Sequence, residues 1–183
     1  MNDFGKDHGL IHEAVVTGRK VGAGQDFWAA LAHSEELFQK VVAFVATVPT
    51  PIFRLVAGFD RDMTKEKWEL LSDTEAKEGE FKPELVEFFK DGEDYVVGDE
   101  IVKRTEQESC GGQRAAESML RDQDKIPEVW RKYVLVFPRT VWRLHYGRRS
   151  VPYLGWDGKR WFLYFYWLGH DFDGRCRVVR LGK

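Results

Sequence analysis

Seven consecutive aromatic and apolar residues at 161–167, Trp-Phe-Leu-Tyr-Phe-Tyr-Trp, constrain the fold of this chain more than any other segment. In a β-strand, successive side chains point to opposite faces. One face then carries Trp161, Leu163, Phe165 and Trp167, which is typical of a core. The other face carries Phe162, Tyr164 and Tyr166, and its two phenols suit a recognition surface. A central strand buried on both faces, with its hydroxyls bonded internally, explains the same pattern equally well.

The composition changes sharply near Pro138. Residues 139–183 hold ten Lys and Arg against three Asp, whereas residues 1–138 hold eighteen Lys and Arg against twenty-seven Asp and Glu. The formal net charge of -2 therefore combines a basic tail with an acidic remainder. The tail also holds eleven of the 26 aromatic residues. Such an asymmetry indicates that the C-terminal segment has a role of its own.

The tail predicts several antiparallel strands. Apolar alternation with a period of two favours strands at 141–146, 151–154, 161–168 and 177–181. The pairs Asp157-Gly158 and Asp173-Gly174 stand between them, and Asp-Gly between apolar runs is a strong hairpin signal. Upstream, the pattern predicts a strand at 85–89, helices at 100–107 and 113–122, and a strand at 133–137. Residues 82–183 are therefore expected to form an α+β domain.

The acidic N-terminal part is expected to divide into two pieces. Residues 1–48 predict a small helical unit, with helices at 9–21 and 35–47, and Ser34 is a good N-cap for the second. The pair of prolines at Pro49 and Pro51 favours a boundary there. Residues 49–81 predict a linker that contains a short strand at 52–57 and a short helix that begins at Asp62 or Thr64 and ends at Leu71.

Several functional classes find no support in the sequence. No apolar run approaches the roughly 18 residues needed to span a bilayer, and residues 1–20 lack a signal-peptide pattern, so we expect a cytoplasmic protein by default. Cys110 and Cys176 are expected to be reduced thiols, although one bridge is open to them. No zinc spacing, cofactor motif or nucleophile–base pair is evident. We therefore expect no enzyme activity, no metal and no cofactor.

Nucleic-acid binding is the main rival to a protein-binding role. Backbone charge combined with stacking platforms is the physical basis of single-strand binding. The acidic remainder would repel phosphates, and the tail arginines could equally neutralise it across an internal interface. The arginines concerned lie among the tail aromatics: Arg143, Arg148, Arg149, Arg160, Arg175, Arg177 and Arg180.

One family resemblance covers the tail. The residues that carry it are Thr140-Val141-Trp142, Val151-Pro152-Tyr153-Leu154, Gly158, Arg160-Trp161, Leu163, Trp167-Leu168-Gly169, Asp171, Gly174 and Arg177-Val178-Val179-Arg180. In these residues the chain resembles the variable proteins of diversity-generating retroelements, which present their C-terminal region on a C-type lectin fold. The likeness is strong over residues 132–183 and extends over residues 82–131 only in the order of elements. Residues 1–80 resemble small uncharacterised bacterial proteins.

The resemblance implies a fixed framework that holds exchangeable ligand-binding positions. Copying directed at adenines rewrites codons that mostly encoded Asn, and Trp, Lys, Glu, Gln and Met cannot be reached. The candidate positions all belong to the reachable set: Leu144, His145, Tyr146, Arg148, Ser150, Gly155, Asp157, Phe162, Tyr164, Tyr166, His170, Asp173, Arg175 and Cys176. The resemblance implies a C-type-lectin-like domain, made of a strand, two helices and an antiparallel β meander. Its expected partner is an unknown protein, with Tyr146, Phe162, Tyr164 and Tyr166 as anchors.

Overall fold

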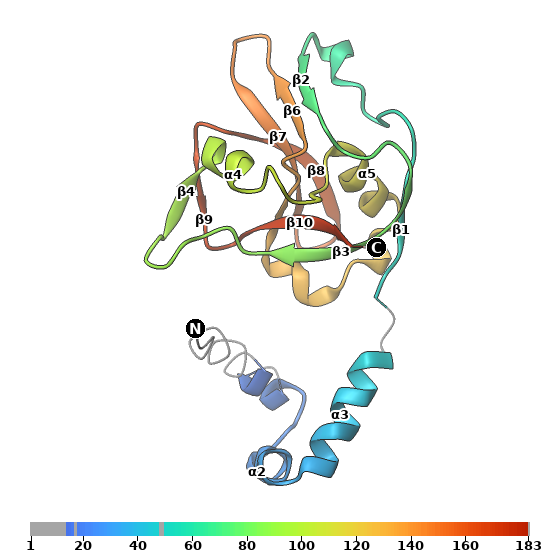
Figure 1. Ribbon diagram of the computed structural model, residues 1–183, viewed down its shortest axis with the longest axis vertical. Coiled ribbons are helices and arrows are strands. Elements are labelled where there is room, and N and C mark those ends of the chain that lie inside the picture. Colours follow the sequence, from blue (N-terminus) through green and yellow to red (C-terminus); the bar gives the residue numbers. More distant parts are fainter. Residues whose placement is uncertain (1–13, 17, 48–49, 183) are drawn as a thin grey trace. The chain divides into compact units, whose positions relative to one another are not determined.

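The computed structural model describes residues 14–16, 18–47 and 50–182 of the chain. The chain divides into two compact units, Met1–Pro49 and Thr50–Lys183 (Figure 1). This division lies one residue from the boundary expected at Pro49. The protein has an α+β architecture with a mostly antiparallel sheet and a few helices.

The described residues of the first unit form helices joined by short non-helical segments. Of the helix expected over 9–21, residues 14–16 and 18–20 are helical, and residues 9–13 and 17 lie outside the described residues. Helices α2 (Gln25–His33) and α3 (Glu35–Thr47) follow. Ser34 caps α3 as predicted, because its Oγ accepts a hydrogen bond of 3.2 Å from the Leu37 amide.

The described residues of the second unit form ten strands and two α-helices. The strands are β1 (Phe53–Leu55), β2 (Glu69–Asp73), β3 (Gly79–Val86), β4 (Tyr95–Val97), β5 (Val134–Val136), β6 (Thr140–Arg143), β7 (Arg149–Trp156), β8 (Trp161–Trp167), β9 (Asp171–Asp173) and β10 (Cys176–Gly182). The α-helices are α4 (Gly98–Arg104) and α5 (Gln113–Arg121). Three short 3₁₀ helices complete the unit: η1 (Met63–Glu66), η2 (Gln123–Lys125) and η3 (Glu128–Lys132).

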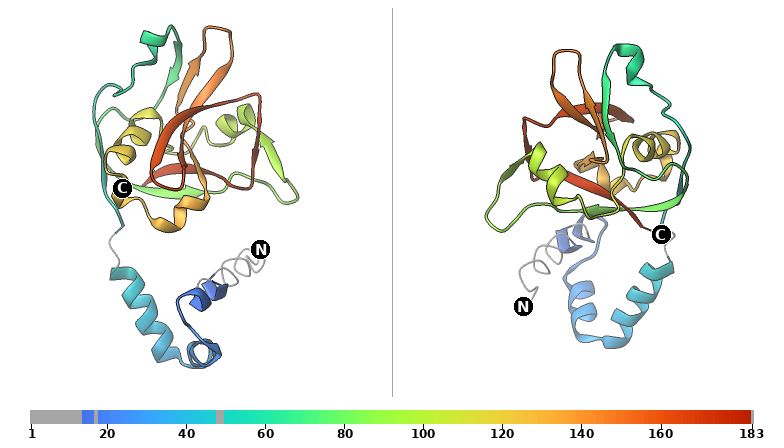
Figure 2. Two further views of the ribbon diagram at one scale, coloured as in Figure 1. Left: turned by 180° about the vertical axis from the view of Figure 1, so that it is seen from behind. Right: turned by 45° about the horizontal axis from the view of Figure 1, so that its top comes forward.

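Eight strands form one sheet. Its order is β1-β3-β10-β5-β7-β6-β2, and β8 pairs with the remaining side of β7. Strands β6, β7 and β8 form the expected antiparallel meander, whereas β10 lies antiparallel to β3 and parallel to β5. Strands β4 and β9 make a separate two-stranded sheet. Figure 2 shows the main sheet from behind, with β3 and β10 side by side.

The centre of the sheet is buried on both faces. On one face α5 packs against β1, β7 and β8, and Ala115, Ala116 and Met119 meet Leu135 and other core residues. On the other face, a second cluster contains Ile101 of α4, Phe172 of β9, Val136 of β5 and Val178 of β10. Alternation thus sends adjacent residues of β5 and β10 into two different cores. A strand buried on both faces reads as a continuous apolar run, which is the pattern of β5.

Residues 49–81 are not the linker that the sequence predicted. Strand β1 falls inside the expected strand, and Asp62 caps η1 by accepting a hydrogen bond of 3.0 Å from the Thr64 amide. The helix expected to reach Leu71 is wrong, because β2 pairs there with β6. Strand β3 then begins at Gly79 and pairs with β1 and β10. These partners are up to a hundred residues away in sequence, so local composition did not reveal them.

Candidate binding surface

Strand β8 presents two different faces, as the sequence predicted, but Leu163 and Trp167 of the expected core face are only half-buried. Trp161 and Phe165 are buried, whereas Tyr164 is 59% exposed and Phe162 and Tyr166 are half-buried. The turn at Asp157-Gly158 sets the register of the β7–β8 hairpin, with Gly158 at φ 96°. Asp157 stabilises that turn by accepting hydrogen bonds from the amides of Lys159 and Arg160 at 2.8 and 2.9 Å. The hairpin therefore fixes which side chains reach the outer face.

An aromatic cluster of four side chains occupies this outer face. Tyr153 of β7 stands opposite Tyr164 in the hairpin. Its ring centroid lies 6.1 Å from that of Phe162, 6.3 Å from that of Tyr164 and 5.6 Å from that of Tyr166, in edge-to-face arrangements. The Tyr166 ring also lies 4.4 Å from that of Phe172, which joins the cluster to the core. The four residues Tyr153, Phe162, Tyr164 and Tyr166 are called the aromatic face below.

The tyrosine hydroxyls of the aromatic face are free of protein partners. Within the described part of the chain, Tyr153, Tyr164 and Tyr166 make ring contacts but no hydrogen bond through their hydroxyls. Burial raises the pKa of Tyr153 and Tyr166, so these phenols remain protonated donors at neutral pH. Strand β8 pairs with β7 alone among the described strands. The alternative of a central strand buried on both faces, with its hydroxyls bonded internally, is therefore wrong.

The turn between β6 and β7 supplies the rim of the aromatic face. The Arg148 guanidinium lies 4.4 Å from the Trp167 ring and 5.5 Å from the Tyr146 ring. Tyr146 is 56% exposed. Residues of this turn and of the aromatic face line a shallow hollow of about 490 Å³, to which His170 and Trp68 also contribute. The surface therefore combines exposed rings, free hydroxyls and one guanidinium.

Most of the fourteen candidate positions are accessible. Seven are exposed: His145, Tyr146, Arg148, Asp157, Tyr164, His170 and Arg175. Four are half-buried: Leu144, Phe162, Tyr166 and Asp173. Eight of the fourteen line the hollow: Leu144, His145, Tyr146, Arg148, Ser150, Tyr164, Tyr166 and His170. The fold thus gathers residues from the β6–β7 turn and β8 around one surface.

Three of the fourteen positions are corrected by their burial. Ser150 is buried in β7 between β6 and β8, and Cys176 is buried in the core, where desolvation raises the pKa of its thiol to about 11. Gly155 lies under the Phe162 ring, and a Cβ there would come within 2.6 Å of that ring. Gly155 and Cys176 cannot contact a partner in this fold, and Ser150, which lines the hollow, is only 2% exposed. Cys110 and Cys176 are both buried free thiols.

The candidate position Asp173 stabilises its own turn, and several residues outside the candidate set line the hollow. Asp173 accepts a hydrogen bond of 2.9 Å from the Arg175 amide and pairs with the Arg175 guanidinium at 2.7 Å. Tyr153 and Trp167 were assigned to the framework, yet both line the hollow. A two-residue loop at Asp157-Gly158 would place Tyr153 opposite Phe162, whereas the loop spans residues 157–160 and Tyr153 lies opposite Tyr164. Nothing in the sequence indicated that Trp68 reaches this surface, because β2 was not predicted.

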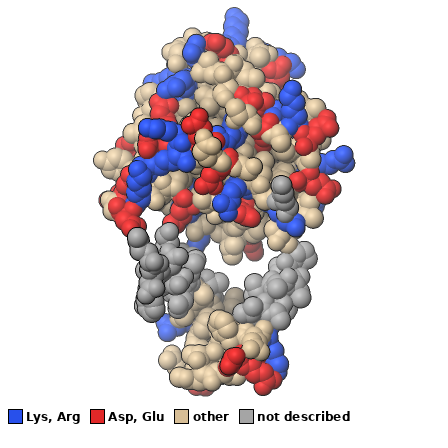
Figure 3. Space-filling model, in the orientation of Figure 1, with Lys and Arg blue, Asp and Glu red and all other residues tan. Residues whose placement is uncertain are grey.

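The tail arginines are mostly neutralised by carboxylates. Four pair with residues of the acidic part: Arg143 with Glu69, Arg149 with Asp99, Arg177 with Glu87 and Arg180 with Glu84, at 2.6 to 3.0 Å. Arg160 and Arg175 pair with aspartates of their own turns. Figure 3 accordingly shows blue and red side chains interspersed on the face of the second unit that is in view.

Chemical groups typical of an active site are not assembled at this surface. His145 and His170 contact aromatic rings and have no carboxylate partner among the described residues. The described ranges contain no cluster of three His, Cys, Asp or Glu residues able to hold a metal ion. They also contain no helix of the length and apolar character that a bilayer crossing requires. Comparison of the chain with protein-family models, curated proteins and solved structures yields no match.

Proposed function

We propose that this chain is a non-enzymatic ligand-binding protein that displays exchangeable side chains on a C-type-lectin-like domain, as the variable proteins of diversity-generating retroelements do. Its aromatic face and the rim formed by the β6–β7 turn would contact the partner. The partner proposed is a protein, because rigid aromatic side chains with hydroxyls provide both contact area and hydrogen bonds at protein interfaces.

The observation that carries the proposal is the free hydroxyls on exposed rings. Tyr164 and Tyr146 expose more than half of their surface, and no described group satisfies the hydroxyls of the aromatic face. The division between framework and exchangeable positions adds support. The apolar framework residues Trp142, Val151, Leu154 and Trp161 are buried, whereas eleven of the fourteen exchangeable positions are exposed or half-buried.

The gene itself provides the first test. The proposal expects a nearby imperfect copy of the 3′ end that differs at adenines, close to a reverse transcriptase gene. Sequencing of the population should find substitutions at the accessible candidate codons and none at Trp142 or Trp161. An invariant 3′ end, or codons whose third bases do not fit an Asn-codon template, would remove the retroelement part of the proposal.

A binding experiment tests the surface separately. A displayed library randomised at Tyr146, Phe162, Tyr164 and Tyr166 should yield folded binders when it is selected against a panel of unrelated proteins. A matched library randomised at Glu69, Glu80, Glu87 and Lys159, which lie on exposed positions elsewhere, should yield few. Equal yields from the two libraries would contradict a dedicated binding face.

Nucleic-acid binding remains the alternative proposal. It draws on Arg148, whose guanidinium stacks on exposed rings and has no carboxylate partner among the described residues. Arg143, Arg149, Arg160, Arg175, Arg177 and Arg180 are paired and Arg139 is only 8% exposed, which leaves little accessible positive charge for phosphates. Binding to a single-stranded oligonucleotide should fall steeply with salt if this alternative holds. Absent or salt-independent binding would exclude it.

A further inference from the structure

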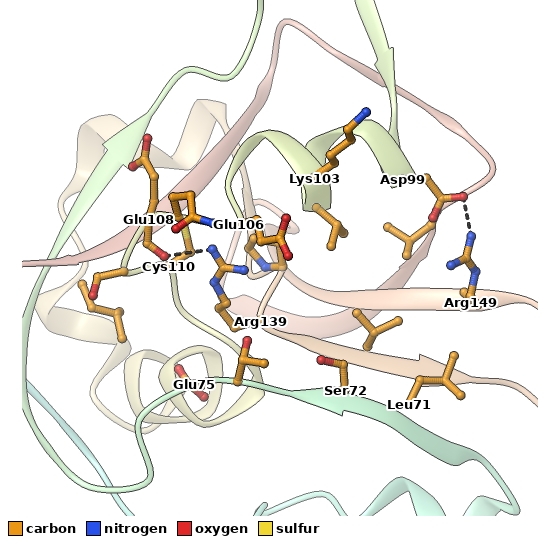
Figure 4. A pocket seen from close by; sticks show the side chains of 18 of the residues that line it. Leu71, Ser72, Glu75, Asp99, Lys103, Glu106, Glu108, Cys110, Arg139 and Arg149 are labelled. Atoms are coloured by element: carbon orange, nitrogen blue, oxygen red, sulfur yellow. Dashed lines mark hydrogen bonds and ion pairs between the residues drawn. The ribbon is translucent and has the colours of Figure 1, made fainter.

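A second hollow lies in the same unit, away from the aromatic face. It has a volume of about 870 Å³ and is formed by α4, the loop that follows it, β2 and the loop between β5 and β6 (Figure 4). It shares no lining residue with the hollow beside the aromatic face. Volumes of roughly 300 to 1,000 Å³ are typical of small-molecule sites. A function for this hollow therefore goes beyond display of the aromatic face.

Arg139 is the side chain that gives the hollow its chemistry. It is only 8% exposed, and its Nη2 donates hydrogen bonds to the carbonyls of Thr105 and Glu108, the latter at 2.9 Å. Its backbone is also held, because its amide donates to Gly111 and its carbonyl accepts from Thr74. The guanidinium is therefore fixed in place at the wall of the hollow, as Figure 4 shows.

The positive charge of Arg139 is not neutralised by protein. Across residues 14–16, 18–47 and 50–182, no carboxylate forms an ion pair with it, and its Nε and Nη1 make no hydrogen bond. Burial of a charge is unfavourable unless the charge is paired. A buried guanidinium with free donors beside an open hollow is therefore an attractive site for an anion.

The other charges of the hollow limit the charge of that anion. Asp99 pairs with Arg149, and Glu75 accepts three hydrogen bonds from the start of α5, at 2.7 to 3.1 Å. Glu108 pairs with Arg180. Within the described chain, the lining charges that form no ion pair are Lys103, Glu106 and Arg139. Their sum is a single positive charge, which favours a monoanion over phosphates of higher charge.

The uncharged lining indicates the rest of the ligand. Leu71, Val102, Val141 and Leu168 provide apolar contact, and the hydroxyls of Ser72 and Ser109 have no hydrogen bond to described residues. We infer that this hollow binds a small monocarboxylate with an apolar body, whose carboxylate accepts hydrogen bonds from Arg139.

Titration calorimetry on the full chain tests the inference with matched probes. Benzoate and hexanoate are expected to bind saturably, whereas benzamide and hexanamide, of similar shape but without charge, are expected to bind at least about tenfold more weakly. Inorganic phosphate should also bind more weakly than the two carboxylates. Equal affinity for acids and amides, tighter binding of phosphate, or no saturable binding of either acid would overturn the inference.

Two variants locate the binding. Arg139→Gln should weaken benzoate binding by roughly tenfold or more, because a charge-assisted hydrogen bond is lost. Because Arg139 also holds the loop after α4, unfolding of Arg139→Gln would abolish binding as well. A second variant therefore leaves Arg139 unchanged. Val102→Phe leaves the hydrogen bonds of Arg139 in place, narrows the hollow and should weaken binding similarly. Tyr164→Ala, on the aromatic face, should leave it unchanged. Unchanged affinity in Arg139→Gln or Val102→Phe would refute the site.

Discussion

Helix α5 and the outer face of β8 reverse the usual relation between polarity and burial. On α5 the polar residues Gln113, Arg114, Glu117 and Ser118 are buried together with the apolar ones. On β8 the aromatic residues Phe162, Tyr164 and Tyr166 remain partly or largely exposed. The two regions differ in whether their polar groups have hydrogen-bond partners within the described chain.

Every buried polar side chain of α5 has hydrogen-bond partners. Glu117 accepts from the amides of Asp60 and Arg61 at 2.8 and 2.9 Å and from Gln113 Nε2 at 2.7 Å. Gln113 Oε1 in turn accepts from Trp142 Nε1 at 2.6 Å. The aromatic face has ring contacts but no such hydrogen bonds. We therefore regard the α5 network as structural and the aromatic face as a surface that lacks its partner.

Loss of Glu117 should produce the largest effect. In Glu117→Ala the amides of Asp60 and Arg61 and the amide group of Gln113 lose their acceptor inside the core. Breaking a buried charged network in this way lowers the free energy of unfolding by about 3 to 5 kcal/mol. Urea denaturation followed by tryptophan fluorescence measures the change.

Glu66→Ala is the matched control for Glu117→Ala. Glu66 pairs with the Arg61 side chain at 2.7 Å, but both partners are more than 40% exposed, so the free energy of unfolding should change by less than about 1 kcal/mol. A similar loss in the two variants would mean that α5 is held by its apolar side alone.

Glu75 should make stability depend on pH above the usual acid range. Burial raises the pKa of its carboxyl from 4.5 to about 7, and this effect outweighs the three amide donors of α5 and the nearby Arg114. The folded state then binds a proton that the unfolded state releases. The contribution of Glu75 to stability is therefore fully present below pH 4.5 and is lost as the pH rises through about 7, by about 3 kcal/mol at roughly 1.4 kcal/mol per pKa unit.

Glu75→Gln should flatten this part of the profile, because Gln can still accept from α5 and does not titrate. Burial also raises the pKa of Glu117, so part of the slope should remain. The exposed aspartates Asp62 and Asp157 have lowered pKa values, and their contribution is lost only as the pH falls through the acid range. Thermal unfolding between pH 4.5 and 8 measures both proteins; parallel profiles would contradict the role of Glu75.

The sequence predicted the parts of this comparison that depend on local pattern. The alternation in residues 161–167, the Asp157-Gly158 turn and the Ser34 cap are local signals, and each predicted its structure correctly. The polar network of α5 depends on partners around residues 60 and 140, which local pattern cannot indicate. The sequence predicted a helix at 113–122, but not that the polar residues of α5 would be buried.

The candidate site was predictable to a similar extent. The period of two predicted the outer face of β8, whereas the positions on the β6–β7 turn came from the family resemblance and lie where a strand to residue 146 was expected. The burial of Ser150 and Cys176 depends on which strands flank β7 and β10, and the parallel pairing of β5 with β10 had no local signal. The hollow at Arg139 is formed by segments near residues 72, 105 and 139, so local sequence pattern did not predict it.

Trp142→Phe should lower the free energy of unfolding by less than Glu117→Ala and by more than Tyr164→Ala. The substitution keeps an aromatic ring in the cluster with Met63 and Phe165 but removes the donor to Gln113. An unsatisfied buried carbonyl and a small cavity together lower the free energy of unfolding by about 2 kcal/mol. Urea denaturation of Trp142→Phe, Gln113→Leu and the double variant separates the two effects, because the double-mutant cycle subtracts what Gln113→Leu loses at Arg61 and Glu117. If the single variant is as stable as the wild type, the hydrogen bond has no role in holding α5 to β6.

Tyr164→Ala should have the smallest effect on folding and the most selective effect on binding. The Tyr164 side chain is mostly exposed, and its ring contact among the described residues is with Tyr153 at a centroid distance of 6.3 Å, so the free energy of unfolding should change by less than about 0.5 kcal/mol. A partner selected on the unchanged aromatic face should nevertheless bind at least about thirtyfold more weakly, as expected for a central aromatic anchor worth 2 kcal/mol or more. Tyr164→Phe separates contact area from hydrogen bonding, because it removes only the hydroxyl that lacks a protein partner. An intermediate loss of affinity in Tyr164→Phe would show that the free hydroxyl is used in binding. If instead Tyr164→Ala destabilised the fold as strongly as Trp142→Phe, the outer face of β8 would belong to the core, and the contrast with α5 would disappear.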